Sequence, residues 1–435
     1  MSAFDATLLP MTGRVDSAGR ASVGGVDLVE LAEEFGTPLY VYDEADMRSR
    51  CREYYAEFHD GAAYASKAFL CTAMARLVAE EGLGIDVATG GELHVVLASG
   101  FPAARIVFHG NNKSEAELRH ALTSGVGRIV ADSFDELDRL EWIAHETGTV
   151  APVHVRVTPG VSAQTHEFIE TGNDDSKFGF GLDCGDAFRA VERVIEHSAL
   201  HFAGIHCHIG SQVFAVDSFA RAVEKMVDLV ALIERETSTT VDELNAGGGL
   251  GVRYLSDDAA PTIAEYADVL RRTLTKALAG AELRSRPRLM CEPGRSISAP
   301  AGLTLYRVGT VKRIEGVRTY VAVDGGMSDN LRPVTYGAQY EAFLPVRAGA
   351  LRPLVATVAG KHCEQGDLLV RDAQLPADVA VGDILATPVT GAYAYAMASN
   401  YNRVPRPAVV FVRDGTARVV VRRETVDDLT RLDAD

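Results

Sequence analysis

The sequence predicts two domains: a TIM-like (β/α)8 barrel, and a C-terminal β-sandwich or β-barrel that also takes in the N-terminal strand. Two observations lead to this fold class, α/β plus all-β. From about residue 60 to residue 295, eight short apolar runs alternate with amphipathic stretches. After residue 295, the chain becomes rich in Val, Thr and Tyr, with turn residues and few helical patterns.

The eight apolar runs are each bounded by turn residues, which is typical of buried parallel strands. They lie at residues 62–66, 84–88, 105–110, 128–132, 152–157, 202–210, 241–249 and 288–294. Amphipathic stretches follow most of them, at 72–81, 92–99, 115–124, 134–146, 221–236 and 264–278. An open doubly wound sheet is the main alternative, but eight strands at this length favour the barrel.

The β-rich runs of the second domain lie at 304–314, 318–326, 353–360 and 407–424. In the last run, Asp414 and Gly415 separate two β-rich halves, which predicts a hairpin turn. The strand-like run at 40–43 is expected to join this domain. We therefore expect an N-terminal segment at 1–45, a barrel at 46–295 and a β domain at 296–435.

Composition narrows the class of protein. The chain has 435 residues with 43 basic and 60 acidic side chains, a net charge of −17 that makes it a poor general binder of nucleic acid. No apolar run approaches the roughly 18 residues of a membrane span, and the N-terminus lacks a signal-peptide pattern. The six cysteines form no CxxC pair, so we expect free thiols in a cytoplasmic protein.

Catalytic groups of a barrel come from the C-terminal ends of its strands. The predicted strand ends carry a polar set: Lys67, Asp86, His109, Asp132, Arg156, His208, Gly247 to Gly249, Glu292 and Arg295. Lys67 is notable because the chain has only seven lysines against 36 arginines. A lysine desolvated among small apolar neighbours gains a lowered pKa and suits a Schiff base. The alternative is a lysine whose stem lies along the strand end.

Two further motifs indicate ligand binding. The segment AGGGLG at 246–251 does not fit the dinucleotide fingerprint, because Val252 replaces its last glycine. Its glycines still allow backbone N–H groups to approach a phosphate, or else form a tight turn. The segment CEPGR ends the eighth run, and its Glu292 and Arg295 either serve two ligand atoms or pair with each other.

His206 and His208 share one face of a strand. We predict no metal site there, because the sequence shows no obvious carboxylate or third ligand nearby. Stacking on a planar cofactor, or core packing, is the expected role. A Schiff-base lysine, a phosphate loop, a stacking histidine and a carboxylate for a pyridinium together specify pyridoxal 5'-phosphate (PLP).

Eight segments carry a family resemblance: YASKA (64–68), DDSKFGFGL (174–182), GIHCHIGSQ (204–212), GGGLG (247–251), CEPGRS (291–296), VDGGMSDNLRPVTYGAQYE (323–341), GKHCEQGD (360–367) and GAYAYAMASNYN (391–402). Through them the chain resembles the fold-type III, PLP-dependent decarboxylases of basic amino acids, and within these the branch that acts on diaminopimelate. The segments span nearly the whole chain. The resemblance implies a barrel plus a β domain, PLP as cofactor and a homodimer with shared active sites.

The resemblance also implies residue roles. Lys67 binds PLP covalently and His208 stacks on its ring. Glu292 pairs with the pyridine nitrogen. The remaining cofactor-site residues are Asp86, Ser211, Gly247, Gly248, Gly249, Pro293, Gly294, Arg295 and Tyr393. The residues that bind the substrate are Arg295, Arg332, Tyr336, Glu364 and Tyr393. Cys363 is the proton donor, and it reaches the partner subunit's active site together with Glu364.

The chemical groups at the far end of the substrate distinguish the decarboxylases of this fold type from one another. Arg332 and Glu364 are complementary to a distal carboxylate and ammonium, which favours meso-diaminopimelate over lysine, ornithine, arginine or carboxynorspermidine. One departure is Gln365, where the family usually has Ser in C-E-S-G-D. An alanine-racemase-like enzyme would lack these motifs. A non-catalytic regulator would be expected to have lost Lys67 or Cys363.

Overall fold

The computed structural model describes residues 3–161 and 176–434, which form two compact units. One unit holds the chain up to Ser49, the segment Val252–Ala259 and everything from Arg295 onward. The other holds Arg50–Gly251 and Ala260–Gly294. Asp174 and Asp175 of the DDSKFGFGL motif lie outside the described residues.

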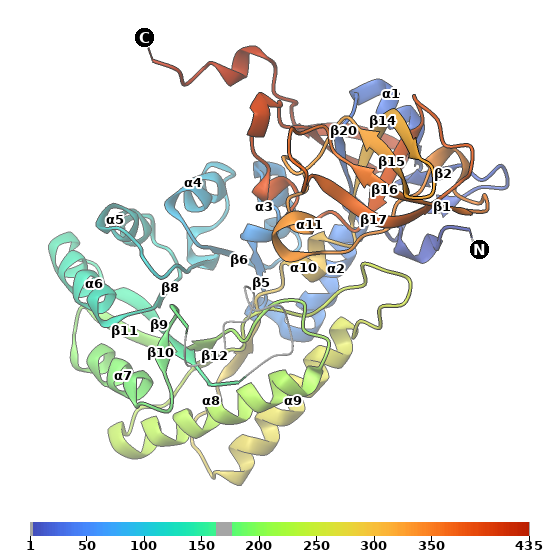
Figure 1. Cartoon of the computed structure of the whole chain (residues 1–435). Helices are drawn as coiled ribbons and strands as arrows, with labels where there is room; N and C mark the ends of the chain where they lie inside the picture. Colours follow the sequence, from blue (N-terminus) through green and yellow to red (C-terminus); the bar gives the residue numbers. More distant parts are fainter. Residues whose placement is uncertain (1–2, 162–175, 435) are drawn as a thin grey trace. The chain divides into compact units, whose positions relative to one another are not determined.

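The second unit is an eight-stranded parallel barrel, which confirms the predicted fold class (Figure 1). Its strands pair in chain order: β5 (Ala63–Ala65), β6 (Gly84–Val87), β7 (Ile106–Phe108), β8 (Arg128–Ala131), β9 (Ala151–Thr158), β11 (Leu200–Cys207), β12 (Glu243–Asn245) and β13 (Arg288–Met290). A parallel bridge between Ala62 and Cys291 brings the first and last strands together, and the N–H of Ala63 donates to the carbonyl of Cys291 at 2.9 Å. Each predicted run overlaps one of these strands.

Helices follow the strands around the barrel (Figure 1). They are α3 (Thr72–Glu80), α4 (Gly90–Ala98), α5 (Glu115–Ser124), α6 (Phe134–Thr147), α7 (Asp186–Glu196), α8 (Val216–Thr237) and α9 (Ile263–Gly280), and α2 (Glu44–Phe58) precedes β5. The predicted face of α8, from Val223 to Ile233, is buried. Ser114 and Glu117 form a capping box that starts α5, a feature worth about 0.5–2 kcal/mol. Helix α7 and strand β10 (Phe180–Gly181) were not predicted.

The first unit is all-β apart from short helices. Its strands are β14 (Gly302–Ile314), β15 (Arg318–Val323), β16 (Leu354–Ala359), β17 (Leu368–Leu375), β18 (Ile384–Pro388), β19 (Ala408–Arg413) and β20 (Thr416–Val421), with β1 (Arg14–Val15), β2 (Ala21–Val23) and β3 (Val26–Asp27) in a small separate sheet before α1 (Leu28–Phe35). The N-terminal strand β4 (Leu39–Asp43) lies between β14 and β19, as predicted. Strand β14 pairs with β4 and β18 in its first half and with β15 in its second.

The predicted hairpin joins β19 and β20. Asp414 and Gly415 both have positive φ, 51° and 75°, as a type I′ turn requires. Strands β17 and β18 were not predicted. None of the helices between residues 3 and 161, or between 176 and 434, has the length and apolar character to cross a membrane.

The segment Val252–Ala259 groups with the β-rich unit, although it lies inside the predicted barrel range. Aromatic and charged packing around Tyr254 contributes to this grouping, as does the ion pair of Arg253 with Asp5 at 3.4 Å. The Tyr254 ring meets that of Tyr340 edge-on at 5.3 Å, and the Tyr254 hydroxyl oxygen accepts a hydrogen bond from Arg295. The sequence pattern of this loop gave no sign of such contacts.

Candidate functional site

Lys67 lies at the C-terminal end of β5, in the short 3-10 helix Ser66–Ala68. Its ammonium is 3.6 Å from the Asp86 carboxylate at the end of β6, as parallel neighbours predict. The expected desolvation of Lys67 is wrong, because its side chain is 45% exposed. The helix turns Ser66 and Ala68 inward and Lys67 outward. Burial instead acts on Asp86 and raises the pKa of its carboxyl to about 8, although Lys67 opposes this rise.

Glu292 follows β13 and is almost fully buried inside the barrel. Its Oε1 accepts hydrogen bonds from His109 Nε2 at 2.7 Å and Asn245 Nδ2 at 2.8 Å, and its Oε2 accepts one from His206 Nε2 at 3.1 Å. Burial alone would raise the pKa of Glu292, but attraction and hydrogen bonds from His109 and His206 outweigh it and hold that pKa well below its usual range. The barrel therefore carries a fixed negative charge at this point.

The two histidines are neutral donors in this network. Burial lowers the pKa of His109, and lowers that of His206 to about 4. Nδ1 of His206 is buried without a partner in the described part of the chain, so the ring proton lies on Nε2 and points to Glu292. The expectation that no carboxylate lies near His206 is thus wrong. The ligand atoms of His109, His206 and Glu292 lie within 4.8 Å of one another, and both histidines hydrogen-bond to the Glu292 carboxylate.

The glycines after β12 allow strand ends to approach closely. A Cβ on Gly248 would lie 2.1 Å from the Glu292 carbonyl oxygen, and one on Gly249 would lie 2.2 Å from that of Gly210. The N–H of Gly247 donates to Asn245 Oδ1 at 2.9 Å, and that of Gly248 to His208 Nδ1 at 3.2 Å. Two of the three predicted phosphate donors are therefore used inside the protein. The N–H of Gly249 has no acceptor among the residues described.

His208 and the other predicted cofactor residues surround this loop. Burial lowers the pKa of His208 well below its usual value, so the ring is neutral. Ser211 is half-buried three residues further on. The carbonyl of Pro293 accepts from the N–H of Ala65 at 3.0 Å, and Gly294 packs against Ala65 as well. The ends of β5, β11, β12 and β13 thus meet around Lys67, His208 and Glu292.

Asp132 and Arg156, also at strand ends, pair with each other at 3.2 Å. Asp132 additionally accepts from the N–H of Gly179 at 2.6 Å, and the guanidinium of Arg156 lies 4.3 Å from the centre of the Phe178 ring. This pair fastens the DDSKFGFGL segment, as far as it is described, to the barrel.

The predicted substrate arginines form a cluster within the β-rich unit. Arg332 begins α11 (Arg332–Tyr336), is 6% exposed, and lies over the rings of Tyr254 and Tyr340 at 4.7 and 5.5 Å. Arg295 lies over the Tyr393 ring at 4.8 Å and donates from Nη1 to the Tyr254 hydroxyl oxygen at 2.7 Å. Tyr336, at the end of α11, is half-buried. No carboxylate in residues 3–161 or 176–434 pairs with Arg332, so this buried cation lacks an anion.

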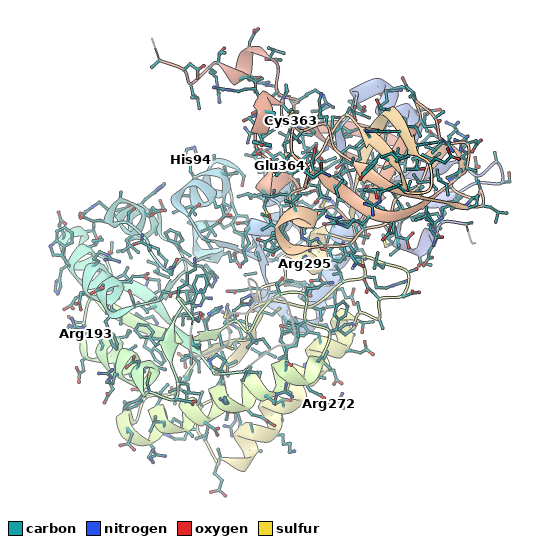
Figure 2. All side chains as sticks on the ribbon, viewed as in Figure 1. His94, Arg193, Arg272, Arg295, Cys363 and Glu364 are labelled. Atoms are coloured by element: carbon teal, nitrogen blue, oxygen red, sulfur yellow. The ribbon has the colours of Figure 1, made fainter. Side chains whose placement is uncertain are left out.

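Cys363 and Glu364 lie next to each other on the loop between β16 and β17, both exposed (Figure 2). The N–H of Cys363 donates to Asn402 Oδ1 at 3.1 Å, and the Tyr401 hydroxyl donates to Glu364 Oε2 at 3.0 Å. Gln365 is exposed as well, so its side chain is not packed inside the loop. The loop presents the thiol and the carboxylate outward.

Sequence reasoning missed several residues of these clusters: Asn245, Tyr254, Tyr340, Tyr401 and Asn402. Asn245 belongs to a strand-end run that the sequence did mark, and His109 was named there without its Glu292 partner. Tyr340 and the last two lie inside motifs that carried the resemblance. The only sequence signal that could have pointed to Tyr254 was its position shortly after the glycines at 247–249.

The chain matches the family model described as pyridoxal-dependent decarboxylase, pyridoxal binding domain, over residues 44–299. It is 49% identical over 428 residues to a diaminopimelate decarboxylase of Mycobacterium tuberculosis, covering 96% of both chains, and 48% identical to one of Bacillus subtilis, covering 97% of both. A crystal structure of diaminopimelate decarboxylase from M. jannaschii with L-lysine matches with a TM-score of 0.90 and 35% identity, covering 98% of both chains. The chain therefore belongs to the diaminopimelate decarboxylases, a branch of the pyridoxal-dependent decarboxylase family.

Proposed function

We propose that this chain is a PLP-dependent carboxy-lyase that converts meso-2,6-diaminopimelate to L-lysine and carbon dioxide, the last step of lysine biosynthesis. The observation that carries the choice of substrate is the buried Arg332, which contacts tyrosines and pairs with no carboxylate in the described part of the chain. A substrate with a second carboxylate supplies the missing anion. Lysine, ornithine and arginine do not carry one at their distal end.

The barrel residues fit PLP by their chemistry. When bound, PLP accepts the electron pair that remains after carbon dioxide leaves. Lys67 supplies the amine that holds the cofactor covalently, next to Asp86. Glu292 would hold a proton at the ring nitrogen, because its carboxylate stays ionised between three N–H donors. His208 would contact the cofactor ring. Ser211, the N–H of Gly249 and the segment from Glu292 to Arg295 would hold the phosphate, with Gly247 and Gly248 shaping the loop.

The β-rich unit supplies the substrate groups. Arg295 and Arg332, with Tyr336, bind the distal carboxylate, and a guanidinium can hold a carboxylate through two parallel hydrogen bonds. Tyr393 contacts both substrate and cofactor, and Glu364 binds the distal ammonium. Cys363 donates the proton that replaces the lost carboxyl group.

We further propose a homodimer in which each subunit lends Cys363 and Glu364 to its partner's active site. The outward-facing loop that carries them supports this arrangement. All six cysteines are thiols without disulfide bonds, which suits an enzyme of the reducing cytoplasm.

The test is carbon dioxide release by the PLP-loaded protein from meso-diaminopimelate, L-lysine, L-ornithine and L-arginine at equal concentrations. We expect release from diaminopimelate alone. Release from one of the other three instead would keep the decarboxylase chemistry and overturn the roles of Arg332 and Glu364. No release from any of them would contradict the proposed function.

A further inference from the structure

Tyr254 lies between Arg295 and Arg332, an arrangement that its position in the sequence does not predict. It lies in the loop Val252–Ala259, is 6% exposed, and contacts Arg295 through its hydroxyl and Arg332 through its ring face. Arg295 and Arg332 are each 6% exposed as well. Two buried guanidiniums around one phenol repel each other, and such a cluster is stable only when an anion or a strong dipole lies close to both.

We infer that Tyr254 is a positioning residue that makes the site specific for substrates with a distal carboxylate. This inference rests on the proposed function. The role of Tyr254 is to hold the two arginines in a fixed arrangement. Its oxygen fixes Nη1 of Arg295 at 2.7 Å, while its ring fixes the plane of Arg332 at 4.7 Å. The two guanidiniums are thereby held in one arrangement before the substrate arrives, which lowers the cost of binding.

The surroundings of Tyr254 support this role. Tyr340 meets its ring at 89°, so the guanidinium of Arg332 lies against both rings at once and its orientation is defined from two sides. Arg332 also donates to the Tyr340 hydroxyl oxygen. The Tyr254 hydroxyl hydrogen has no acceptor within the described part of the chain, so it is available to a bound carboxylate.

The two guanidiniums also act on the hydroxyl itself. Burial raises the pKa of Tyr254, but attraction to Arg295 and Arg332 outweighs burial and lowers that pKa below its usual value. A more acidic phenol is a stronger hydrogen-bond donor to a carboxylate.

The experiment compares L-lysine with cadaverine, two diamines that differ by one carboxylate. L-lysine is the product of the proposed reaction, and its remaining carboxylate is the one that was distal in diaminopimelate. Their dissociation constants are measured by calorimetry with PLP-loaded wild type and with Tyr254→Phe, which keeps the ring and removes the hydroxyl. We expect the variant to bind L-lysine about tenfold more weakly or worse, and cadaverine within about twofold of wild type. The KM for meso-diaminopimelate should rise by a similar factor, while kcat changes less.

The control is Tyr42→Phe, which removes another buried hydroxyl of the same unit, one that donates to the Gly391 carbonyl at 2.8 Å. It should leave the ratio of the two dissociation constants unchanged. Tyr254→Leu removes the ring face too and should weaken L-lysine binding further. Melting temperatures of all variants show whether each is folded.

Three results would overturn the role of Tyr254. Equal weakening for both ligands would indicate a general structural role, and unchanged L-lysine binding would show that the hydroxyl does not matter. A wild type that binds both ligands equally well would show that no distal-carboxylate site exists. Carbon dioxide release from diaminopimelate is measured separately, so failure of the proposed function is distinguishable from failure of this inference.

Discussion

Glu292 remains charged inside the barrel because three N–H groups donate hydrogen bonds to its carboxylate. Asn245 and His109 hold one carboxylate oxygen and His206 the other. Hydrogen bonds to an ionised group are roughly twice as strong as those between neutral groups, so three donors offset much of the cost of burial. A carboxylate fixed in this way is well suited to hold the proton of a pyridine ring.

His206→Gln tests this network through pH. The pKa of His206 is lowered from about 6.5 to about 4, so the stability gained by keeping the ring neutral is complete above pH 6.5 and lost as the pH falls through 4. Between these limits wild type should lose up to about 3 kcal/mol of unfolding free energy that the variant does not lose. Urea unfolding at a series of pH values measures the difference.

A matched control is His94→Gln, on the exposed surface of α4 (Figure 2). It should follow the wild-type pH dependence, because an exposed ring has similar surroundings in the folded and unfolded chains. Parallel curves for wild type and His206→Gln would mean that burial of this ring does not govern acid stability.

Residue identities were predictable where a residue type carries its own chemistry. Lys67 and Glu292 stood out as polar groups at the ends of apolar strands, and the structure brings His208 to the same ring of strand ends. Their partners were not predictable, because the contacts join residues far apart in sequence, such as His109 and Glu292. The prediction that Lys67 is desolvated was wrong, because the direction of its side chain depends on the local 3-10 turn.

At the scale of elements, all eight barrel strands were predictable, because a parallel strand covered on both faces reads as an apolar run. Helix α7 buries Ala187, Ala190, Val191 and Val194, and two of these are alanines, which mark an apolar face weakly. Strand β17 mixes buried and exposed positions without strict alternation, and β18 ends in a proline. Patterns of this kind do not separate a strand from a loop.

The Asn402 side chain holds the loop between β16 and β17 at Cys363. Asn402 has a φ of 51° and its Oδ1 accepts from the N–H of Cys363 at 3.1 Å and lies 3.3 Å from His362 Nδ1. Asn402→Gly keeps the backbone conformation but removes the amide, so we expect kcat to fall about tenfold or more as Cys363 loses its position, with PLP still bound. Steady-state kinetics and the cofactor absorbance measure the two effects.

Asn402→Asp is the companion variant, because its carboxylate keeps an acceptor at the same place. It should retain most of the activity that Asn402→Gly loses. Loss of PLP from Asn402→Gly, or equal activity of both variants, would contradict a role in holding Cys363.

At the scale of the molecule, the chain passes between its two units after Ser49, Gly251, Ala259 and Gly294. From the sequence we expect boundaries near residues 45 and 295, because of the strand-like run at 40–43 and the change of pattern near residue 295. The middle two enclose Val252–Ala259, whose membership depends on Tyr254 and its partners. A short excursion of this kind has no compositional signature.

The proposed dimer has a direct test in mixed subunits. Lys67→Ala removes the proposed cofactor lysine and Cys363→Ala removes the proposed proton donor, so each variant alone should be nearly inactive. If each active site takes Lys67 from one subunit and Cys363 from its partner, a mixed dimer contains one complete site. Random exchange makes about half of the dimers mixed, so about a quarter of the wild-type activity should return.

The measurement is carbon dioxide release from meso-diaminopimelate after the two variants are mixed and allowed to exchange. The control mixes each variant with itself and should stay inactive. If no activity returns although mass spectrometry detects mixed dimers, Lys67 and Cys363 act within one subunit and the shared site is wrong.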